Sequence, residues 1–426
     1  MSARLAPLDD AAPRAVAGPR RLVLLFLVIP LFNYLGAKIS LTPPNSLTGI
    51  TGFDPVNMAI QAFVLAMGAG YTLLHPRRVV TLAVAAFPFV LLFGVAGASV
   101  LWSQSPEHSL RRTVGITAQV LFVFILYAEL GLRRAMKLVL GVVLLTVVMG
   151  LMEAVLRPSF GFDTGFYSNA IRGVYPQKNT FGTALIHGSL ALSFLMLTDD
   201  RLRRWHLMVA LVLLVMLVLA RSATALVLTL TVLGLTGAWL AARAGGLWLA
   251  ALLLGSGLVA AGGLAFTGAL GVEGFYALLG KDETLTGRTE IWASVDRAIA
   301  DRPWLGHGFA AFWIQGLAPA ELIWLDLQWE TPDAHSGWRE VVLQIGWVGF
   351  AALAGTALLT LGMALWRLAG PRRALGYWVL ILMVVAIIHG NTESAMFRGD
   401  ALLILWMLGW LGLVAWRGEG ELERPG

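Results

Sequence analysis

Cysteine is absent from the 426 residues of the chain. Without a thiol, the protein can form no disulfide, no thiolate nucleophile and no cysteine-ligated metal site. Charge is also scarce, because Asp, Glu, Lys and Arg together make up 13% of the residues, about half of the share found in average soluble proteins. This deficit excludes a water-soluble enzyme, a nucleic-acid-binding module and a disordered chain.

Two common ligand-binding patterns are missing as well. The seven histidines form no cluster with Asp or Glu at metal-ligand spacing. The sequence also lacks a P-loop, and the glycine-punctuated turn Gly306-His307-Gly308 lacks the strand and helix context that would give it a nucleotide-binding role. We therefore expect no metal and no other cofactor.

What the chain does contain is a series of long apolar runs. Hydrophobic residues make up 58% of it, and the mean hydropathy is +0.76. Because a helix needs about 17–25 predominantly apolar residues to cross a bilayer, the runs predict an all-α fold, a polytopic transmembrane helical bundle of about 12 spans. The predicted spans are centred near residues 22–37, 57–74, 79–101, 113–130, 136–156, 180–197, 205–220, 223–241, 246–269, 339–366, 375–389 and 401–416.

Polar breaks divide the chain into three parts. We expect transmembrane helices 1–9 in residues 1–270, one large periplasmic loop with short amphipathic helices in residues 271–337, and helices 10–12 with a cytoplasmic tail in residues 338–426. Lys and Arg concentrate in short loops on one side, which the positive-inside rule assigns to the cytoplasm together with both termini. Arg20 and Arg21 precede the first span, which lacks a clear cleavage site, so we interpret it as retained.

The basic residues on the outer side act against the positive-inside bias, so topology does not account for them. The outer loops also hold most of the acidic residues and the aromatic-rich stretches, and we therefore expect the chemistry there. The outer basic residues are Lys38, Arg111, Arg112, Arg157, Arg172, Lys178, Arg221, Lys281, Arg288, Arg297, Arg302, Arg339 and Arg398.

The outer loop 157–179 offers the first candidate cations. Arg172 and Lys178 bracket a Gly-Val-Tyr-Pro turn, and Lys178 and Asn179 stand at the predicted start of a helix. Backbone donors and the helix dipole make such a start favourable for an anion. The alternative is a contact with lipid headgroups plus an Asn close to a helix cap.

Arg221 stands between two apolar runs and is predicted to lie in the tight outer turn of a helical hairpin. A cation held in or near hydrocarbon costs about 2.5–3.5 kcal/mol on insertion scales, which favours a specific anionic partner. The alternative is that its side chain snorkels to the interface.

Arg288 precedes the stripe Ile291, Val295 and Ile299, with Trp292 beside it, which predicts an amphipathic helix in the large loop. The helix dipole disfavours an Arg at that start, which indicates a bound anion or an acidic neighbour. A salt bridge to Glu290 or to another loop is the alternative.

His335 lies at the predicted outer start of a long apolar helix, with Asp333 as its expected N-cap. In the first turn the dipole disfavours the protonated ring, which suits a neutral general base. The alternative is a structural histidine. Glu393, in the outer polar turn 391–394, is a candidate to order an arginine or to bind acceptor hydroxyls, with a helix-capping turn as its alternative.

Several motifs together resemble the O-antigen ligase/polymerase superfamily, most closely its exopolysaccharide-production (O-antigen polymerase-type) branch. They occur in matching order and spacing over most of the chain, from about Trp102 to Ser394. These motifs are Gly-Val-Tyr-Pro-Gln-Lys-Asn-Thr-Phe-Gly at 173–182, Arg221-Ser222, Gly-Arg-Thr-Glu-Ile-Trp at 287–292, Asp-Arg-Pro-Trp-Leu-Gly-His-Gly at 301–308, Ala334-His335-Ser336, and Gln-Ile-Gly-Trp-Val-Gly at 344–349.

The resemblance implies a metal-independent glycosyltransferase of the bacterial inner membrane that takes a glycan from undecaprenyl diphosphate on the periplasmic face. It implies that Arg221 and Arg288 hold the donor diphosphate, and that His335 activates the acceptor hydroxyl or helps to hold the leaving group. The family commonly has Asn after this His, where this chain has Ser336, so that hydrogen bond is expected to be weaker or remade. The expected substrate-binding residues are Arg172, Lys178, Asn179, Trp292, Ser336, Arg339 and Glu393.

Two reactions share this donor chemistry and differ in the acceptor. Polymerisation of lipid-linked repeat units into a surface polysaccharide is the first expectation, and ligation of the glycan onto lipid A-core is the alternative. A transporter of the same lipid is the third possibility. It is less favoured, because transporters place charged residues and broken helices near the bilayer midplane, whereas the predicted spans of this chain are nearly free of charge. The expected partners are the glycan donor, a glycan or lipid A-core acceptor, the bilayer, and a flippase and chain-length regulator of the same pathway, with no nucleic acid.

Overall fold

The computed structural model describes residues 20–38, 55–163, 169–199, 201–245, 288–328, 330–392 and 401–414. Within these ranges every regular secondary-structure element is a helix, apart from a single antiparallel bridge between Phe162 and Ile171, and turns and loops connect the helices. The predicted all-α fold is therefore confirmed. A helix satisfies its backbone groups internally, as hydrocarbon requires.

The helices follow the apolar runs of the sequence. They are α1 (Arg20–Tyr34), α2 (Pro55–Leu74), α3 (Pro76–Ala85), α4 (Phe87–Ala98), the short 3-10 helix η1 (Ser99–Leu101), α5 (Pro106–Leu156), α6 (Pro158–Gly161), α7 (Lys178–Thr198), α8 (Arg204–Ala220), α9 (Ala223–Ala244), α11 (Arg288–Asp301), α12 (Ala318–Leu327), α13 (Gly337–Leu368), α14 (Arg373–Thr392) and α15 (Ala401–Val414).

Six described helices are long and apolar enough to cross a membrane, namely α2, α5, α7, α9, α13 and α14. A seventh span results if α3 and α4, which meet at a 90° bend, are counted as one, and α8 and α15 are shorter apolar helices. The protein is thus embedded in a membrane. The total of about 12 spans stays a prediction, and the predicted span at 246–269 lies outside the described residues.

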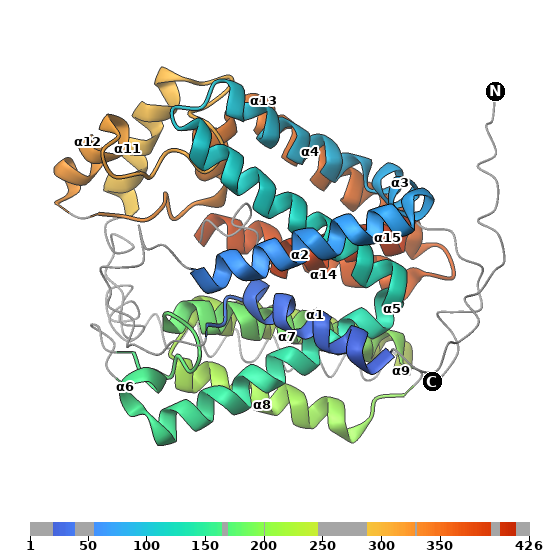
Figure 1. Ribbon diagram of the computed structural model, residues 1–426. Coiled ribbons are helices and arrows are strands. Elements are labelled where there is room, and N and C mark those ends of the chain that lie inside the picture. The colour runs from blue at the N-terminus through green and yellow to red at the C-terminus, as the bar shows by residue number, and fades with distance from the viewer. Residues whose placement is uncertain are drawn as a thin grey trace.

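Gly131 divides α5 into two helical halves, because its backbone angles of φ 68° and ψ 170° are not helical. A left-handed φ favours glycine, which lacks a Cβ. The halves match the runs predicted at 113–130 and 136–156, and they run in opposite directions (Figure 1).

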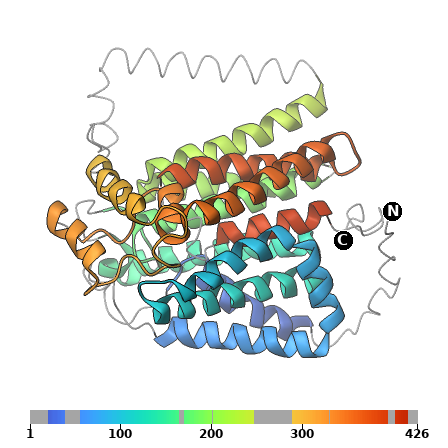
Figure 2. The ribbon, with the colours of Figure 1, turned by 90° about the horizontal axis from the view of Figure 1, so that it is seen from above.

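Helices α7 and α15 form the interior of the bundle. In α7, 89% of the most apolar window is buried, and every residue of α15 from Ala401 to Leu413 is buried. Seen from above, α2 and α9 lie on opposite sides of the bundle with α15 between them (Figure 2). The indole of Trp378 in α14 ties this interior together by donating to the carbonyl of Leu190 in α7 at 2.8 Å.

One end of the bundle, here called the loop end, carries α6, α11 and α12 (Figure 1). Segments far apart in the sequence are joined there. The Lys38 amide donates to the carbonyl of Val174 at 2.8 Å, and the Trp102 indole donates to the carbonyl of Leu305, also at 2.8 Å. The loops that the sequence predicts on one side of the membrane are thus gathered at one end of the molecule.

The long helix α13 is broken at Gly346, which has φ 66° and ψ −173°, whereas the sequence predicts an unbroken helix over 339–366. The segment 303–308 of the large loop fills the break. The Trp347 amide donates to the carbonyl of Pro303 at 2.8 Å, and the Gly308 amide donates to the carbonyl of Gln344 at 2.9 Å. The loop therefore supplies partners that the interrupted helix cannot supply itself.

Candidate functional site

His335 lies just before α13 and not in its first turn, which corrects the sequence-based expectation. Ser336 is the N-cap in place of Asp333, and His335 has a left-handed φ of 47° that no helical residue adopts. The Asp333 carboxylate accepts the His335 backbone N–H at 2.7 Å instead of capping the helix. His335 therefore does not stand in the first helical turn, where the helix dipole is expected to disfavour its protonated ring.

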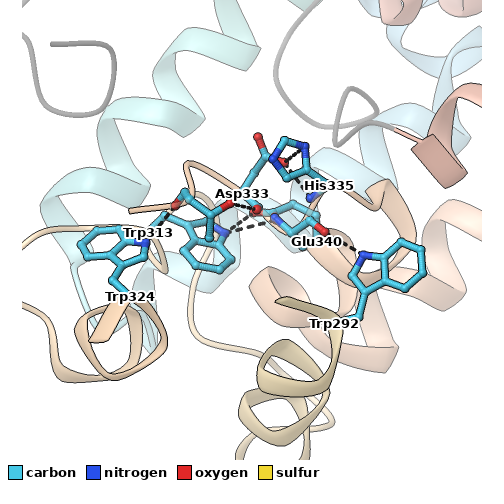
Figure 3. Close-up of polar contacts among 8 residues, drawn as sticks. Trp292, Trp313, Trp324, Asp333, His335 and Glu340 are labelled. Atoms are coloured by element: carbon cyan, nitrogen blue, oxygen red, sulfur yellow. Dashed lines mark hydrogen bonds and ion pairs between the residues drawn. The ribbon is translucent and has the colours of Figure 1, made fainter. Parts of the chain in front are cut away.

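The Asp333 carboxylate also lies beside the imidazole. Its Oδ1 is 3.6 Å from Nδ1 of His335, with the Asp333 side chain 6% exposed and the His335 side chain 22% exposed (Figure 3). A carboxylate at this distance stabilises positive charge that develops on the ring. The pair is thus suited to accept a proton from a group that approaches the exposed part of the ring.

Ala334, the residue that precedes His335, is held at both of its backbone polar groups. The Ala334 amide donates to Oε2 of Glu340 at 2.9 Å, and the Ala334 carbonyl accepts from the indole of Trp292 at 3.0 Å. Helix α11 and helix α13 thereby fix the same residue of the loop between them (Figure 3).

Glu340 is a buried carboxylate, with 4% of the residue exposed. Besides the Ala334 amide, it accepts from the indole of Trp313 at 3.1 and 3.2 Å and from the side-chain amide of Gln344 at 2.6 Å. Glu340 is not among the predicted site residues, because a Glu at the start of an apolar helix resembles an ordinary interfacial charge.

A small hydrophobic core supports this arrangement from the large loop. The predicted stripe of α11 is confirmed, because Ile291 and Val295 are buried and Ile299 packs against the same cluster. Trp324 of α12 belongs to it and stacks on Trp313 with ring centroids 6.4 Å apart. The predicted amphipathic helices of the large loop are thus present in its described part.

Arg339 lies on the outer surface of the same group. Its guanidinium is 4.6 Å from the centroid of the Trp292 ring, and its Nε donates to Asp296 Oδ1 at 2.9 Å. The side chain is 35% exposed. Two of the predicted substrate-binding residues, Arg339 and Trp292, therefore lie next to the segment that carries His335.

His307 is a buried histidine that connects the large loop to two other elements. Its Nε2 lies 2.9 Å from the carbonyl of Ala298, and its Nδ1 lies 3.3 Å from Oε1 of Gln104. Burial is the largest effect on the pKa of His307 and lowers it. The hydrogen bond to the Ala298 carbonyl acts in the opposite direction, and Arg302 lowers and Asp301 raises the pKa by smaller amounts. The ring is therefore neutral at neutral pH.

A second group of predicted residues lies where α7 begins and where α8 turns into α9. Lys178 is the first residue of α7, as predicted, and its ammonium donates to the carbonyl of Arg221 at 3.2 Å. Arg221 ends α8 in a left-handed conformation with an exposed side chain, which confirms the predicted hairpin turn. Ser222 donates to Asn179 Oδ1 at 3.4 Å.

A polar cavity of about 10 Å³ adjoins this second group, and this volume corresponds to about one water molecule. Asn179, Thr183, Ser222 and His389 line it together with apolar side chains. The start of α7 and the start of α9 thus both contribute residues to the lining of this cavity. None of the hydrogen bonds described above joins this group to that of His335.

Arg172 is engaged with its own loop. Its guanidinium donates to the carbonyls of Ser159, Phe160 and Pro176 at 3.0 to 3.1 Å, and the residue is 3% exposed. Burial lowers its pKa from the ordinary arginine value, while Asp163 acts in the opposite direction. These contacts give Arg172 a part in holding the loop, and its contact with substrate stays a prediction.

Two further predicted residues, Arg288 and Glu393, lie partly or wholly outside the described residues. Arg288 is the first residue of α11, as predicted, and its side chain lies outside the described part of the structure. Glu393 lies wholly outside the described residues. Among the residues that are described, no three His, Asp or Glu side chains form a group that could hold a metal ion.

The fold and the site together define a class, a polytopic α-helical membrane protein whose polar side chains gather at one end of the bundle. Residues 207–354 match the protein family described as O-Antigen ligase. The chain is also similar to the exopolysaccharide production protein ExoQ of Rhizobium meliloti (strain 1021), with 26% identity over 270 residues. The alignment covers 60% of this chain and 60% of that relative. The resemblance that the sequence motifs predict is therefore confirmed.

Proposed function

We propose that the protein is a membrane glycosyltransferase that polymerises undecaprenyl-diphosphate-linked oligosaccharide repeat units into a surface polysaccharide on the periplasmic face. The observation that carries the proposal is the extent of the family match. Residues 207–354 include Arg221, Arg288 and His335, the three residues for which the sequence predicts catalytic roles.

Arg221 and Arg288 neutralise the donor diphosphate in this proposal. The leaving group is an anion on a lipid tail, so its cations must stand at headgroup depth, and Arg221 lies exposed at a helix turn of the loop end. A guanidinium offers paired donors that stay charged, which suits a diphosphate whose charge increases as it leaves.

His335 is the base in the same proposal. The acceptor hydroxyl oxygen bonds to the anomeric carbon of the donor sugar, and the bond from that carbon to the diphosphate oxygen breaks. The hydroxyl proton passes to Nε2 of His335, and Asp333, 3.6 Å from Nδ1, stabilises the imidazolium that forms. The diphosphate departs with the bonding electrons.

Polymerisation is preferred over ligation because of the relative whose name refers to exopolysaccharide production. The description of the matched family, O-Antigen ligase, supports the alternative, transfer of the glycan onto lipid A-core. Both reactions use the same donor and the same residues. A flippase and a chain-length regulator of the pathway are the proposed protein partners.

The test uses purified protein in nanodiscs with an undecaprenyl-diphosphate oligosaccharide, in the presence and absence of lipid A-core, with products separated on a gel. A ladder of repeats without lipid A-core supports a polymerase. A single shift that requires lipid A-core supports a ligase in its place. Absence of both products with the cell's own repeat unit would contradict the glycosyltransferase and leave transport of the lipid as the better explanation.

A further inference from the structure

We propose that Glu340 is a positioning residue that presents His335 to the substrate, an inference that rests on the proposed role of His335 as the base. The hydrogen bonds of Glu340 described above do not involve the imidazole. Glu340 acts on the residue before His335, through the Ala334 amide that it accepts at 2.9 Å.

The conformation of His335 is the reason that such a residue is needed. A non-glycine residue at φ 47° adopts a sparsely populated conformation that persists only when the surroundings determine it. Ala334 is fixed by Glu340 at its N–H and by Trp292 at its carbonyl. These two contacts fix the backbone of Ala334, the residue that precedes the left-handed φ. The Asp333 carboxylate fixes the His335 N–H itself.

The hydrogen-bond pattern requires a carboxylate at position 340. Oε1 accepts from Gln344 and Trp313, and Oε2 accepts from Trp313 and Ala334, so both oxygens face donors. An amide would turn its NH₂ group toward one of them. Gln344 cannot reverse its own amide without cost, because its Oε1 already accepts the Ala310 backbone N–H at 2.8 Å.

Exchanging the side chains at positions 340 and 344 tests the proposal, because a carboxylate and an amide then face each other in the reverse order. In Glu340→Gln, the new NH₂ group must face either the Gln344 donor or the Ala334 and Trp313 donors in a buried place, so the hold on Ala334 is weakened directly or through displacement of the side chain. In the double variant Glu340→Gln/Gln344→Glu, the new amide at position 340 accepts from Ala334 and Trp313 through its oxygen, and its NH₂ group donates to the new carboxylate at position 344. That carboxylate still accepts the Ala310 amide, so every bond has a donor and an acceptor again.

A matched control is available in the same loop. Glu321 in α12 accepts a backbone N–H, that of Gly316, at 2.7 Å, and no described hydrogen bond joins it to Ala334. Glu321→Gln makes the same chemical change to another carboxylate that holds the main chain. We expect it to leave His335 unaffected.

The experiment measures each full-length variant in nanodiscs in two ways. The first readout is the rate at which diethyl pyrocarbonate modifies His335, followed by mass spectrometry of the peptide that contains it, which needs no activity. The second is glycan transfer, with kcat and KM for the lipid-linked donor. We expect Glu340→Gln to change the modification rate severalfold and to lower kcat about tenfold or more with KM within about twofold. The double variant recovers most of both, and Glu321→Gln changes neither.

The two readouts separate failure of this inference from failure of the proposed function. An altered modification rate with unchanged transfer supports Glu340 as the residue that positions His335 and removes His335 from the chemistry. An unchanged modification rate in a folded Glu340→Gln overturns the inference, whatever the transfer activity. If Glu340→Gln does not fold, the double variant is used for the test. Modification and transfer at wild-type rates in the double variant support the inference. A changed rate of modification or of transfer in the folded double variant overturns it, as does failure of the double variant to fold.

Discussion

Oδ1 of Asp333 contacts both the backbone and the ring of His335, since it accepts the backbone N–H at 2.7 Å and lies 3.6 Å from the ring Nδ1 (Figure 3). One carboxylate oxygen thereby couples the unusual backbone conformation of the histidine to the orientation of its ring. The sequence-based expectation gives Asp333 a different partner, the start of α13.

We predict that Asp333→Asn lowers turnover in glycan transfer about 10- to 100-fold. The amide oxygen still accepts the backbone N–H, but the neutral side chain no longer stabilises the imidazolium formed during transfer. The measurement is kcat in nanodiscs. Asp326→Asn is the control, because Asp326 is 60% exposed and pairs only with the surface residue Arg297 among the described ion pairs. Equal turnover of both variants and the wild type would show that Asp333 is not coupled to the chemistry.

Removing the proposed diphosphate ligands gives the second prediction. Arg221→Ala and Arg288→Ala are each expected to abolish product formation, and Arg221→Lys is expected to retain only part of it, because an ammonium lacks the paired donors of a guanidinium. His335→Ala is expected to abolish product as well. Arg297→Ala, which removes an exposed cation of the same helix α11, serves as the control. Active, well-expressed variants at positions 288 and 335 would refute the assignment of the site.

The break in α13 gives a prediction about stability. Gly346 has φ 66°, and a Cβ at this position would overlap the carbonyl oxygen of Trp304. Because φ 66° with ψ −173° is a combination that essentially only glycine adopts, Gly346→Ala is expected to cost about 1–3 kcal/mol from the backbone conformation alone. It is also expected to lower the unfolding temperature of the detergent-solubilised protein by several degrees. Gly355→Ala is the matched control in the same helix, because a Cβ there meets nothing within 4 Å. Equal losses in both variants would contradict the described packing of the loop.

His307 predicts a pH dependence of stability. Burial depresses its pKa in the folded protein, so the folded state favours the neutral ring more than the unfolded state does. The stability that this provides is fully present above about pH 6.5, the ordinary histidine pKa, and is lost as the pH falls through the depressed value. Thermal unfolding measured from pH 7.5 to pH 5 is expected to show this loss, and His307→Gln is expected to reduce the slope. Identical slopes would exclude His307 as the titrating group.

The final prediction concerns metals. Glycan transfer is expected to be unaffected by EDTA, since the proposed step uses arginine guanidinium groups where other transferases use a divalent cation. Activity is measured after dialysis against the chelator and again after Mg²⁺ or Mn²⁺ is restored. Loss on chelation with recovery on adding metal would require a revised mechanism.

The predictable features of this protein are those that depend on local patterns. The apolar runs coincide with helices, Lys178 begins α7, Arg221 occupies a tight turn, and Ile291 and Val295 face a core, all of which follow from spacing and residue type. Each requires knowledge only of neighbours within a few turns of the chain.

The unpredicted features depend on partners that are distant in sequence. Gly346 lies in an apolar stretch that reads as continuous helix, and only the passage of residues 303–308 explains why it breaks. Glu340 reads as a surface charge, yet Trp313 and Ala334 reach it from the large loop. The sequence predicts a helical His335 because Asp333 has the residue type of an N-cap, and the actual use of Asp333 by the His335 backbone leaves no signal in the spacing.

The repair of α13 by an earlier segment of the chain has a consequence for biosynthesis. Residues 303–308 leave the ribosome before Gly337–Leu368, so the segment that completes the interrupted helix already exists when that helix is made. The carbonyl groups that accept from the amides at the break are thus synthesised before those amides. The amides can therefore be paired as soon as the helix enters the membrane.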